Sequence, residues 1–218
     1  MANRVDLYKL LHKQLNHFFE FTPNSHFEEC FQIALHRAEE CLNLTSGKYW
    51  TGKIDPYHTV QYSIFLYYLS NTLGKNPLNQ EYANQVYYLN KIMNCVDWFW
   101  AIDLPCHFFA EHPVASVLGR ANYGDFLFFM QGCTIGTNRK NGVIQRPTLG
   151  NYVVCYTNST IIGNCNIGNH VIISAGSYIK EETIPDQSIV FGSSPALVVK
   201  PFAKERCQEI LQLIWREP

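Results

Sequence analysis

The sequence predicts an α+β protein in which an amino-terminal helical domain precedes a parallel β-helix built from six-residue repeats. Three observations support this fold class. The segment IIGNCNIGNHVIISAGSYIK repeats with a period of six, the first half carries helical patterns, and Gly and Asn punctuate the second half. A period of six is neither the two of an ordinary strand nor the 3.6 of a helix.

The repeat consists of isoleucines six residues apart, each followed four places later by a small or β-branched residue. The isoleucines are Ile161, Ile167, Ile173 and Ile179, and the small residues are Cys165, Val171 and Ser177. Earlier repeats place Cys155 and Leu149 in this phase, and Ile135, Phe129, Tyr123 and Val117 in a second one. If each repeat is one short strand and a turn, three repeats form a triangular coil with the aliphatic residue inside. A sandwich of ordinary strands would instead show alternation and wider turn spacing.

The two phases of the repeat are separated by an interruption. Ile135 and Leu149 lie fourteen residues apart, whereas two repeats would span twelve, and the polar segment GTNRKNGVIQRP lies between them. We therefore expect a loop that leaves the coil here, which is a common position for binding residues.

The amino-terminal half is predicted to be helical over residues 1–102. Ser25 and Glu28 fit a capping box, and Asp55 before Pro56 fits a cap and first turn. Gly74 is the expected end of that second helix. A further helix is expected around EYANQVYYLNKIMNC. The β-helix is expected to cover 103–201, and 202–218 to form a short C-terminal helix.

Composition narrows the function classes. Seventeen basic and eighteen acidic residues leave a net charge of −1, and no basic run is present, so no nucleic-acid partner is expected. The apolar stretch YSIFLYYL is much shorter than the roughly 20 residues of a membrane helix, and the amino terminus lacks a signal-peptide core. We therefore expect a cytoplasmic protein with no membrane insertion. The eight scattered cysteines form no CxxC pair and are expected to be reduced.

Three segments of the second half carry a family resemblance. CTIGTNRKNGVIQRPTLG matches TLGGTGK…DRHPKIG, IIGNCNIGNHVIISAGSYI matches ILGNIxIGxGAxIGAGSVV, and IPDQSIVFGSSPALVVKP matches VPxxxxxxGxPAxIVxKP. These motifs resemble the hexapeptide-repeat acyltransferases, and among them the serine acetyltransferases most. The resemblance covers residues 103–201 and implies a left-handed parallel β-helix.

The resemblance implies a histidine general base. His112 in EHPVASVLG matches the DHATGxVxG motif that carries the family's catalytic histidine. The family's acidic partner lies in a D-x-H-P motif fifteen residues earlier, whereas Asp103 lies nine residues earlier, one repeat short. Glu111 is an alternative partner, and His107 is a second candidate base. Histidine titrates near neutral pH, and a carboxylate behind it orients the ring and stabilises the imidazolium.

The resemblance also implies direct acetyl transfer from acetyl-CoA to a hydroxyl, without an acyl-enzyme. Cys133, Cys155 and Cys165 would then be structural. The positions that match the family's coenzyme groove are Gly136, Thr137, Thr157, Ala175, Ser194 and Lys200. Because that groove lies between neighbouring β-helices, a homotrimer or a dimer of trimers is expected.

The chain departs from the family in the segment that binds the acceptor, because the family's DRHP reads IQRP here, with Gln145 and Arg146 in place of the arginine and histidine. The helical signature DIxAVxxRDPA is also absent. A sugar or sugar-nucleotide hydroxyl is therefore favoured over L-serine, with Gln145, Asn138, Asn141 and Tyr156 as possible hydroxyl partners and Arg146 for a phosphate.

Two other classes share this fold. A γ-type carbonic anhydrase needs three histidines around one metal, but only His170 lies inside the repeats, so no metal is expected. A non-catalytic β-helix that acts as a scaffold or subunit is the remaining alternative.

Overall fold

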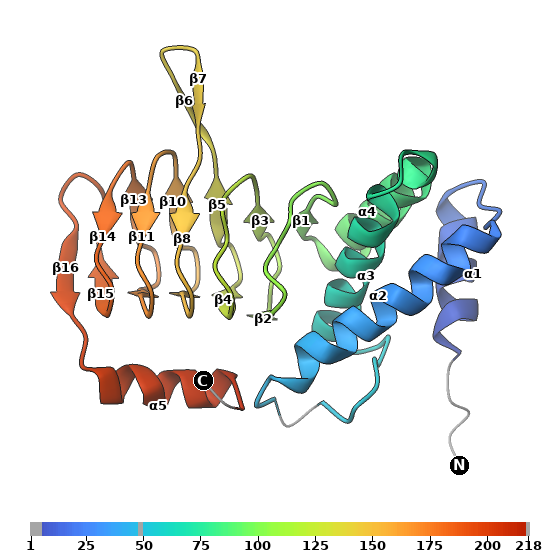
Figure 1. The fold of residues 1–218 in the computed structure, drawn as a ribbon, viewed down its shortest axis with the longest axis horizontal. Coiled ribbons are helices and arrows are strands. Elements are labelled where there is room, and N and C mark those ends of the chain that lie inside the picture. The colour runs from blue at the N-terminus through green and yellow to red at the C-terminus, as the bar shows by residue number, and fades with distance from the viewer. Residues whose placement is uncertain (1–5, 48–49, 217–218) are drawn as a thin grey trace.

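The computed structural model describes residues 6–47 and 50–216, which form a helical domain followed by a parallel β-helix (Figure 1). The helical domain contains α1 (Leu7–Phe18), α2 (Ser25–Asn43), α3 (Thr59–Gly74), the short 3-10 helix η1 (Pro77–Asn79) and α4 (Gln80–Asn94). In α3, 14 of 16 residues are buried, so this helix is the centre of the domain and packs between α2 and α4.

Two helices begin at residues other than those predicted. The side chain of Asn24, and not Ser25, caps α2 by accepting a hydrogen bond from the backbone N–H of Phe27 at 2.9 Å. His58 is the N-cap of α3, and Asp55 belongs to the turn before it. Asn and Ser are comparably good caps, so the sequence pattern alone does not choose between neighbours.

The predicted end of α3 at Gly74 is confirmed. A Cβ atom at Gly74 would lie 2.1 Å from the indole ring of Trp100, so this position has no room for a side chain. The predicted helix over residues 81–95 is α4, which ends in the left-handed residue Cys95.

Three sheets form the sides of the β-helix, and each is named here after one of its strands. The β5 sheet contains β1 (Asp97–Trp98), β3 (Val117–Leu118), β5 (Thr134–Gly136), β10 (Thr160–Ile162) and β13 (Tyr178–Lys180). The β8 sheet contains β8 (Thr148–Leu149), β11 (Asn166–Ile167) and β14 (Thr183–Ile184). The β9 sheet contains β2 (Phe108–Glu111), β4 (Leu127–Met130), β9 (Val154–Cys155), β12 (Ile172–Ile173), β15 (Ser188–Phe191) and, antiparallel at its end, β16 (Val198–Pro201).

This architecture is the left-handed parallel β-helix that was predicted. The repeat isoleucines 161, 167, 173 and 179 are all buried, with at most 2% exposed, and fill the interior of the coil. The prediction was wrong at Val117, which is 39% exposed, because Leu118 points inward instead and pairs with Ile135. The parallel pairing also begins at Asp97, before residue 103, because β1 pairs with β3.

Two segments depart from the coil. The predicted loop is the antiparallel hairpin of β6 (Asn138–Lys140) and β7 (Val143–Gln145), which projects away from the β-helix (Figure 1). Helix α5 (Lys204–Ile214) runs along the β-helix and covers the β9 sheet, where Leu211 and Trp215 pack on Phe128, Val154 and Ile172. Within residues 6–47 and 50–216, no helix is both long enough and apolar enough to cross a membrane.

Candidate active site

His112 lies on a two-residue insertion in the coil. Glu111 pairs with Met130 of the next coil, and the N–H of Gly132 donates to the carbonyl of Val114 at 2.9 Å. Met130 and Gly132 are separated by one residue, so Val114 occupies the place of Gln131, and His112 and Pro113 have no counterparts there. The insertion lifts His112 out of the regular turn, with a φ of +50°.

The His112 pocket is an open cavity of about 420 Å³ between three parts of the chain. Glu111 and His112 come from the first coils, Ser46 and His58 come from the connection between α2 and α3, and Leu213 comes from α5. Glu111 and His112 are both exposed. The structure therefore brings two of the predicted catalytic residues to one pocket at the junction of the helical domain and the β-helix.

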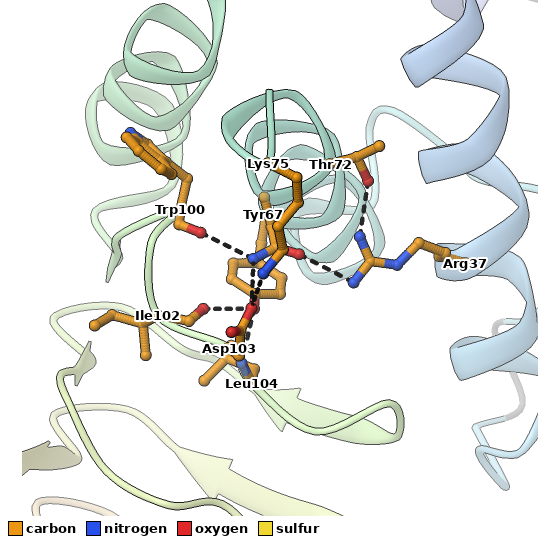
Figure 2. Close-up of polar contacts among 9 residues, drawn as sticks. Arg37, Tyr67, Thr72, Lys75, Trp100, Ile102, Asp103 and Leu104 are labelled. Carbon is orange, nitrogen blue, oxygen red and sulfur yellow. Dashed lines mark hydrogen bonds and ion pairs between the residues drawn. The ribbon is translucent and has the colours of Figure 1, made fainter. Parts of the chain in front are cut away.

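Asp103 lies in a different environment (Figure 2). Its carboxylate forms an ion pair with Lys75 and accepts a hydrogen bond from Asn71 at 3.2 Å. Partial burial acts to raise the pKa of Asp103, but the hydrogen bonds from Lys75 and Asn71 outweigh it and lower the pKa. Asp103 lines a second cavity, which does not include His112. Through Lys75 and Asn71, Asp103 links the segment that follows α4 to helix α3.

Asp97 is a further candidate for the acidic partner, which the motif comparison did not include. It lies fifteen residues before His112, which is the spacing of the family's aspartate, so no lost repeat is needed. The backbone from Cys95 to Asp97 runs beside the turn that follows His112, since the N–H of Ala115 donates to the carbonyl of Cys95 at 2.8 Å. The Asp97 carboxylate accepts hydrogen bonds from Tyr87 and Lys91, both at 2.6 Å. The signal that identifies it was the spacing itself.

His107 has a carboxylate partner already. Its Nδ1 lies 2.7 Å from Oδ2 of Asp125, and its ring stacks on Phe126 with centroids 5.0 Å apart. The stack continues along the coils through Tyr152 and His170, with centroid distances of 4.5 and 4.9 Å. His107 is thus one end of an aromatic column at the corner before the β9 sheet, whereas His112 lies at the corner after it.

Most of the predicted coenzyme residues border the β5 sheet. Thr157 and Ala175 lie on the corner that carries His112, since the N–H of Gly176 donates to the carbonyl of Thr157 at 2.8 Å. Gly136 and Thr137 lie at the opposite edge of the same sheet, at the base of the hairpin. Helix α5 covers the β9 sheet, so these residues border a side of the β-helix other than the one on which α5 packs.

The carboxyl-terminal candidates are divided between two sheets. Ser194 continues the β5 sheet, because its N–H donates to the carbonyl of Tyr178 at 2.8 Å and its hydroxyl accepts from the N–H of Lys180 at 3.0 Å. Lys200 lies on β16, opposite Ile189, and therefore belongs to the β9 sheet. The structure does not bring Lys200 to the other predicted coenzyme residues.

Gln145 and Arg146, two of the residues predicted to bind the acceptor, lie at the base of the hairpin. Gln145 pairs with Asn138 across β6 and β7, and its side-chain Oε1 is buried without a hydrogen-bond partner among the residues that the structure describes. Arg146 is exposed and lines the same cavity as Asp103.

The cysteines at the repeat positions are interior residues. Cys133, Cys155 and Cys165 are at most 2% exposed, and burial raises the pKa of the Cys155 and Cys165 thiols. A buried thiol with a raised pKa is a poor nucleophile. This agrees with a structural role.

A curated protein from Synechococcus elongatus, named serine acetyltransferase, is 35% identical over 83 residues, which are 38% of this chain and 34% of that protein. The chain is similar to serine acetyltransferases. A second serine acetyltransferase, from Bacillus pumilus, is 28% identical over 127 residues, which are 55% of this chain and 58% of the relative. The chain thus spans from about a third to less than two thirds of the length of these curated relatives. No protein-family model matches the chain.

The similarity to serine acetyltransferases extends to the fold. The crystal structure of serine acetyltransferase from Brucella abortus in complex with coenzyme A matches with a TM-score of 0.60 at 16% identity. The match covers 89% of this chain and 73% of that chain, so it includes helices as well as the β-helix. At this identity it shows a common fold.

Proposed function

We propose that the protein is an acetyl-CoA-dependent O-acetyltransferase that acts on a hydroxyl of a small acceptor by direct transfer. The observation that carries the proposal is the position of His112, on a two-residue insertion that borders both a pocket and the β5 sheet. The relatives named serine acetyltransferase and the fold shared with a coenzyme A complex support the same reaction class.

In the proposed reaction, His112 removes the proton from the acceptor hydroxyl while the oxygen attacks the thioester carbonyl. Collapse of the tetrahedral intermediate forms the acetyl ester, breaks the C–S bond and returns the proton from the imidazolium to the departing coenzyme A thiolate. No oxidant or metal takes part in these steps. No protein nucleophile is needed, which agrees with the burial of the repeat cysteines.

Three carboxylates are candidates for the partner of His112. Glu111 shares its pocket, Asp97 has the spacing of the family's aspartate, and Asp103 is the residue favoured by the shortened motif. We favour Asp97 over Asp103, because the backbone from Cys95 to Asp97 runs beside the turn that follows His112, whereas Asp103 lines a cavity that does not include His112. In this role the carboxylate would orient the imidazole and stabilise its protonated form.

Coenzyme A is proposed to lie along the β5 sheet, next to Gly136, Thr137, Thr157, Ala175 and Ser194. A second chain would complete this groove, so we propose a homotrimer or a dimer of trimers. Threefold packing would use the β5 sheet, because the coenzyme candidates border it and α5 occupies the β9 sheet.

For the acceptor we propose a sugar or sugar-nucleotide hydroxyl, with L-serine as the alternative that the names of the relatives favour. The basis is that Gln145 and Arg146 replace the arginine and histidine of the family's DRHP segment. Without those two partners, the charges of a free amino acid would be uncompensated in the site. The test measures coenzyme A thiol release with L-serine and with a panel of nucleotide-linked sugars. Efficient turnover of L-serine below 1 mM (roughly the upper end of ordinary KM values) would overturn the sugar proposal. Failure of all acceptors, with coenzyme A binding intact, would favour a scaffold.

A further inference from the structure

Two arginines line the cavity that also includes Asp103. Its volume is about 510 Å³, and Arg120 and Arg146 both contribute to its wall. Within residues 6–47 and 50–216, neither guanidinium group forms a hydrogen bond or an ion pair. We propose that this cavity, called the Arg120–Arg146 cavity, binds a phosphate-bearing small molecule. The proposal shares Arg146 with the proposed acceptor site, but its test needs no acetyl transfer.

The charge of the cavity favours an anion. Among the described residues that line the cavity, Asp103 is the one that carries a carboxylate, and the ammonium group of Lys75 neutralises it. Two unpaired guanidinium groups therefore leave the lining positively charged. Arginine presents planar, paired N–H donors that match phosphate oxygens, and two arginines match a doubly charged group better than a singly charged carboxylate.

Both walls of the cavity are held by other contacts. On the helical side, Tyr67 accepts a hydrogen bond from the N–H of Leu104 and donates one to the carbonyl of Ile102, each at 2.8 Å (Figure 2). Asn71 donates to the carbonyl of Trp100 at 2.8 Å and to Asp103. The chain segment that forms this wall is thereby fixed to α3.

On the β-helix side, the backbone N–H of Asn122 donates to the carbonyl of Pro147 at 2.9 Å, and the Asn122 amide donates to Thr148 at 3.1 Å. The Tyr123 hydroxyl donates to the carbonyl of Gly119 at 2.8 Å. These bonds join the corner after Arg120 to the residues that follow Arg146. Walls held in place reduce the ordering cost of binding.

The size of the cavity points to more than a bare ion. Small-molecule sites commonly measure about 300–1,000 Å³, and 510 Å³ lies within that range. Ala101 and Ala121 contribute short side chains to the lining, which leaves room for a neutral body attached to the phosphate. A phosphorylated small molecule thus fits both the charge and the volume.

Inorganic pyrophosphate serves as the probe, titrated into the full chain by isothermal calorimetry at low ionic strength without acetyl-CoA. We expect binding that weakens with added salt, and a loss of about tenfold or more in affinity for Arg120→Gln and for Arg146→Gln. Arg139→Gln is the matched control, because Arg139 is exposed on β6 and its side chain forms no hydrogen bond or ion pair within the part of the chain that the structure describes. Acetate at equal concentration should bind more weakly than pyrophosphate.

Three results would overturn the proposal. The first is that the wild type binds no pyrophosphate, the second is that the Arg120→Gln and Arg146→Gln variants both bind it as tightly as the wild type, and the third is that Arg139→Gln loses as much affinity as those two variants. Acetate binding as tight as pyrophosphate would overturn the choice of phosphate. Circular dichroism and Tm check that the variants fold. If a Gln variant does not fold, Arg146→Lys replaces it; Lys keeps the charge but loses the paired donors, so a partial loss of affinity is expected.

Discussion

The ammonium group of Lys75 forms an ion pair with the carboxylate of Asp103 and so joins the end of α3 to the segment that enters the β-helix. The Asp103 side chain is 72% exposed, and exposed ion pairs contribute little to stability. The contacts with Lys75 and Asn71 nevertheless occupy the carboxylate that the sequence comparison, with one repeat missing, predicted to be the partner of His112.

Asp103→Asn is therefore expected to be a mild variant. Thermal unfolding should show a loss of at most about 1 kcal/mol, because an exposed pair is screened by solvent and Asn keeps a hydrogen-bonding oxygen. Turnover should fall less than in a His112 variant. A loss of turnover as large as that of the His112 variants, with Tm unchanged, would return Asp103 to the role of catalytic partner.

His112→Ala is expected to lower turnover by about 10²-fold or more, because the acceptor hydroxyl would lose its base. Coenzyme A affinity and circular dichroism should stay unchanged. His112 has a φ of +50°, which Asn tolerates better than Ala, so His112→Asn separates loss of the base from backbone strain. His107→Ala is the matched control. A large loss in His107→Ala with full activity in both His112 variants would show that the base was misassigned.

Asp97→Asn tests the newly identified carboxylate through pH as well as rate. Partial burial acts to raise the pKa of Asp97, but hydrogen bonds from Lys91 and Tyr87 outweigh it and lower the pKa below 3.8. A depressed folded-state pKa adds stability above the unfolded pKa, and that stability is lost as the pH falls through the folded value. The Tm of the wild type should thus be higher than the Tm of Asp97→Asn at neutral pH, and this difference in Tm should shrink below pH 3.8.

The activity of Asp97→Asn distinguishes catalysis from packing. If Asp97 is the partner of His112, Asp97→Asn should lower kcat at neutral pH more than Asp103→Asn does, with coenzyme A affinity unchanged. A variant that melts earlier but keeps its full kcat would show that Asp97 serves only the contact with α4.

Assembly can be tested on the β5 sheet. Val117 projects from the β5 sheet and is 39% exposed. If neighbouring chains pack on this sheet, Val117→Lys should shift a trimer toward monomers in sedimentation equilibrium at micromolar protein, because a charge would be buried without a partner. Asn166→Lys on the exposed β8 sheet is the control. A wild-type monomer under these conditions would contradict both the trimer and the shared groove.

The periodicity of the sequence was sufficient for the β-helix but not for its first coil. Repeats of six place one aliphatic residue inside at each turn, so Ile161, Ile167 and Ile173 could be assigned to the core directly. The coil around Val117 has its neighbours seventeen and twenty residues away along the chain, at Thr134 and Asp97. Such irregular spacing shifts the phase by one residue and reverses which side chain points inward.

The site shows the same division between local pattern and tertiary contact. The sequence by itself determined the six-residue repeat, the position of the loop that leaves the coil and the motif around His112, because each depends on residues close together in the chain. The tertiary structure decided that α5 covers the β9 sheet, that Lys75 binds Asp103 and that Arg120 and Arg146 share a cavity. Lys75 and Asp103 are 28 positions apart, and Arg120 and Arg146 are 26 positions apart. Helix α5 and the β9 sheet are separate elements. The formation of these contacts depends on how the helical domain packs against the first coils, which no local pattern encodes.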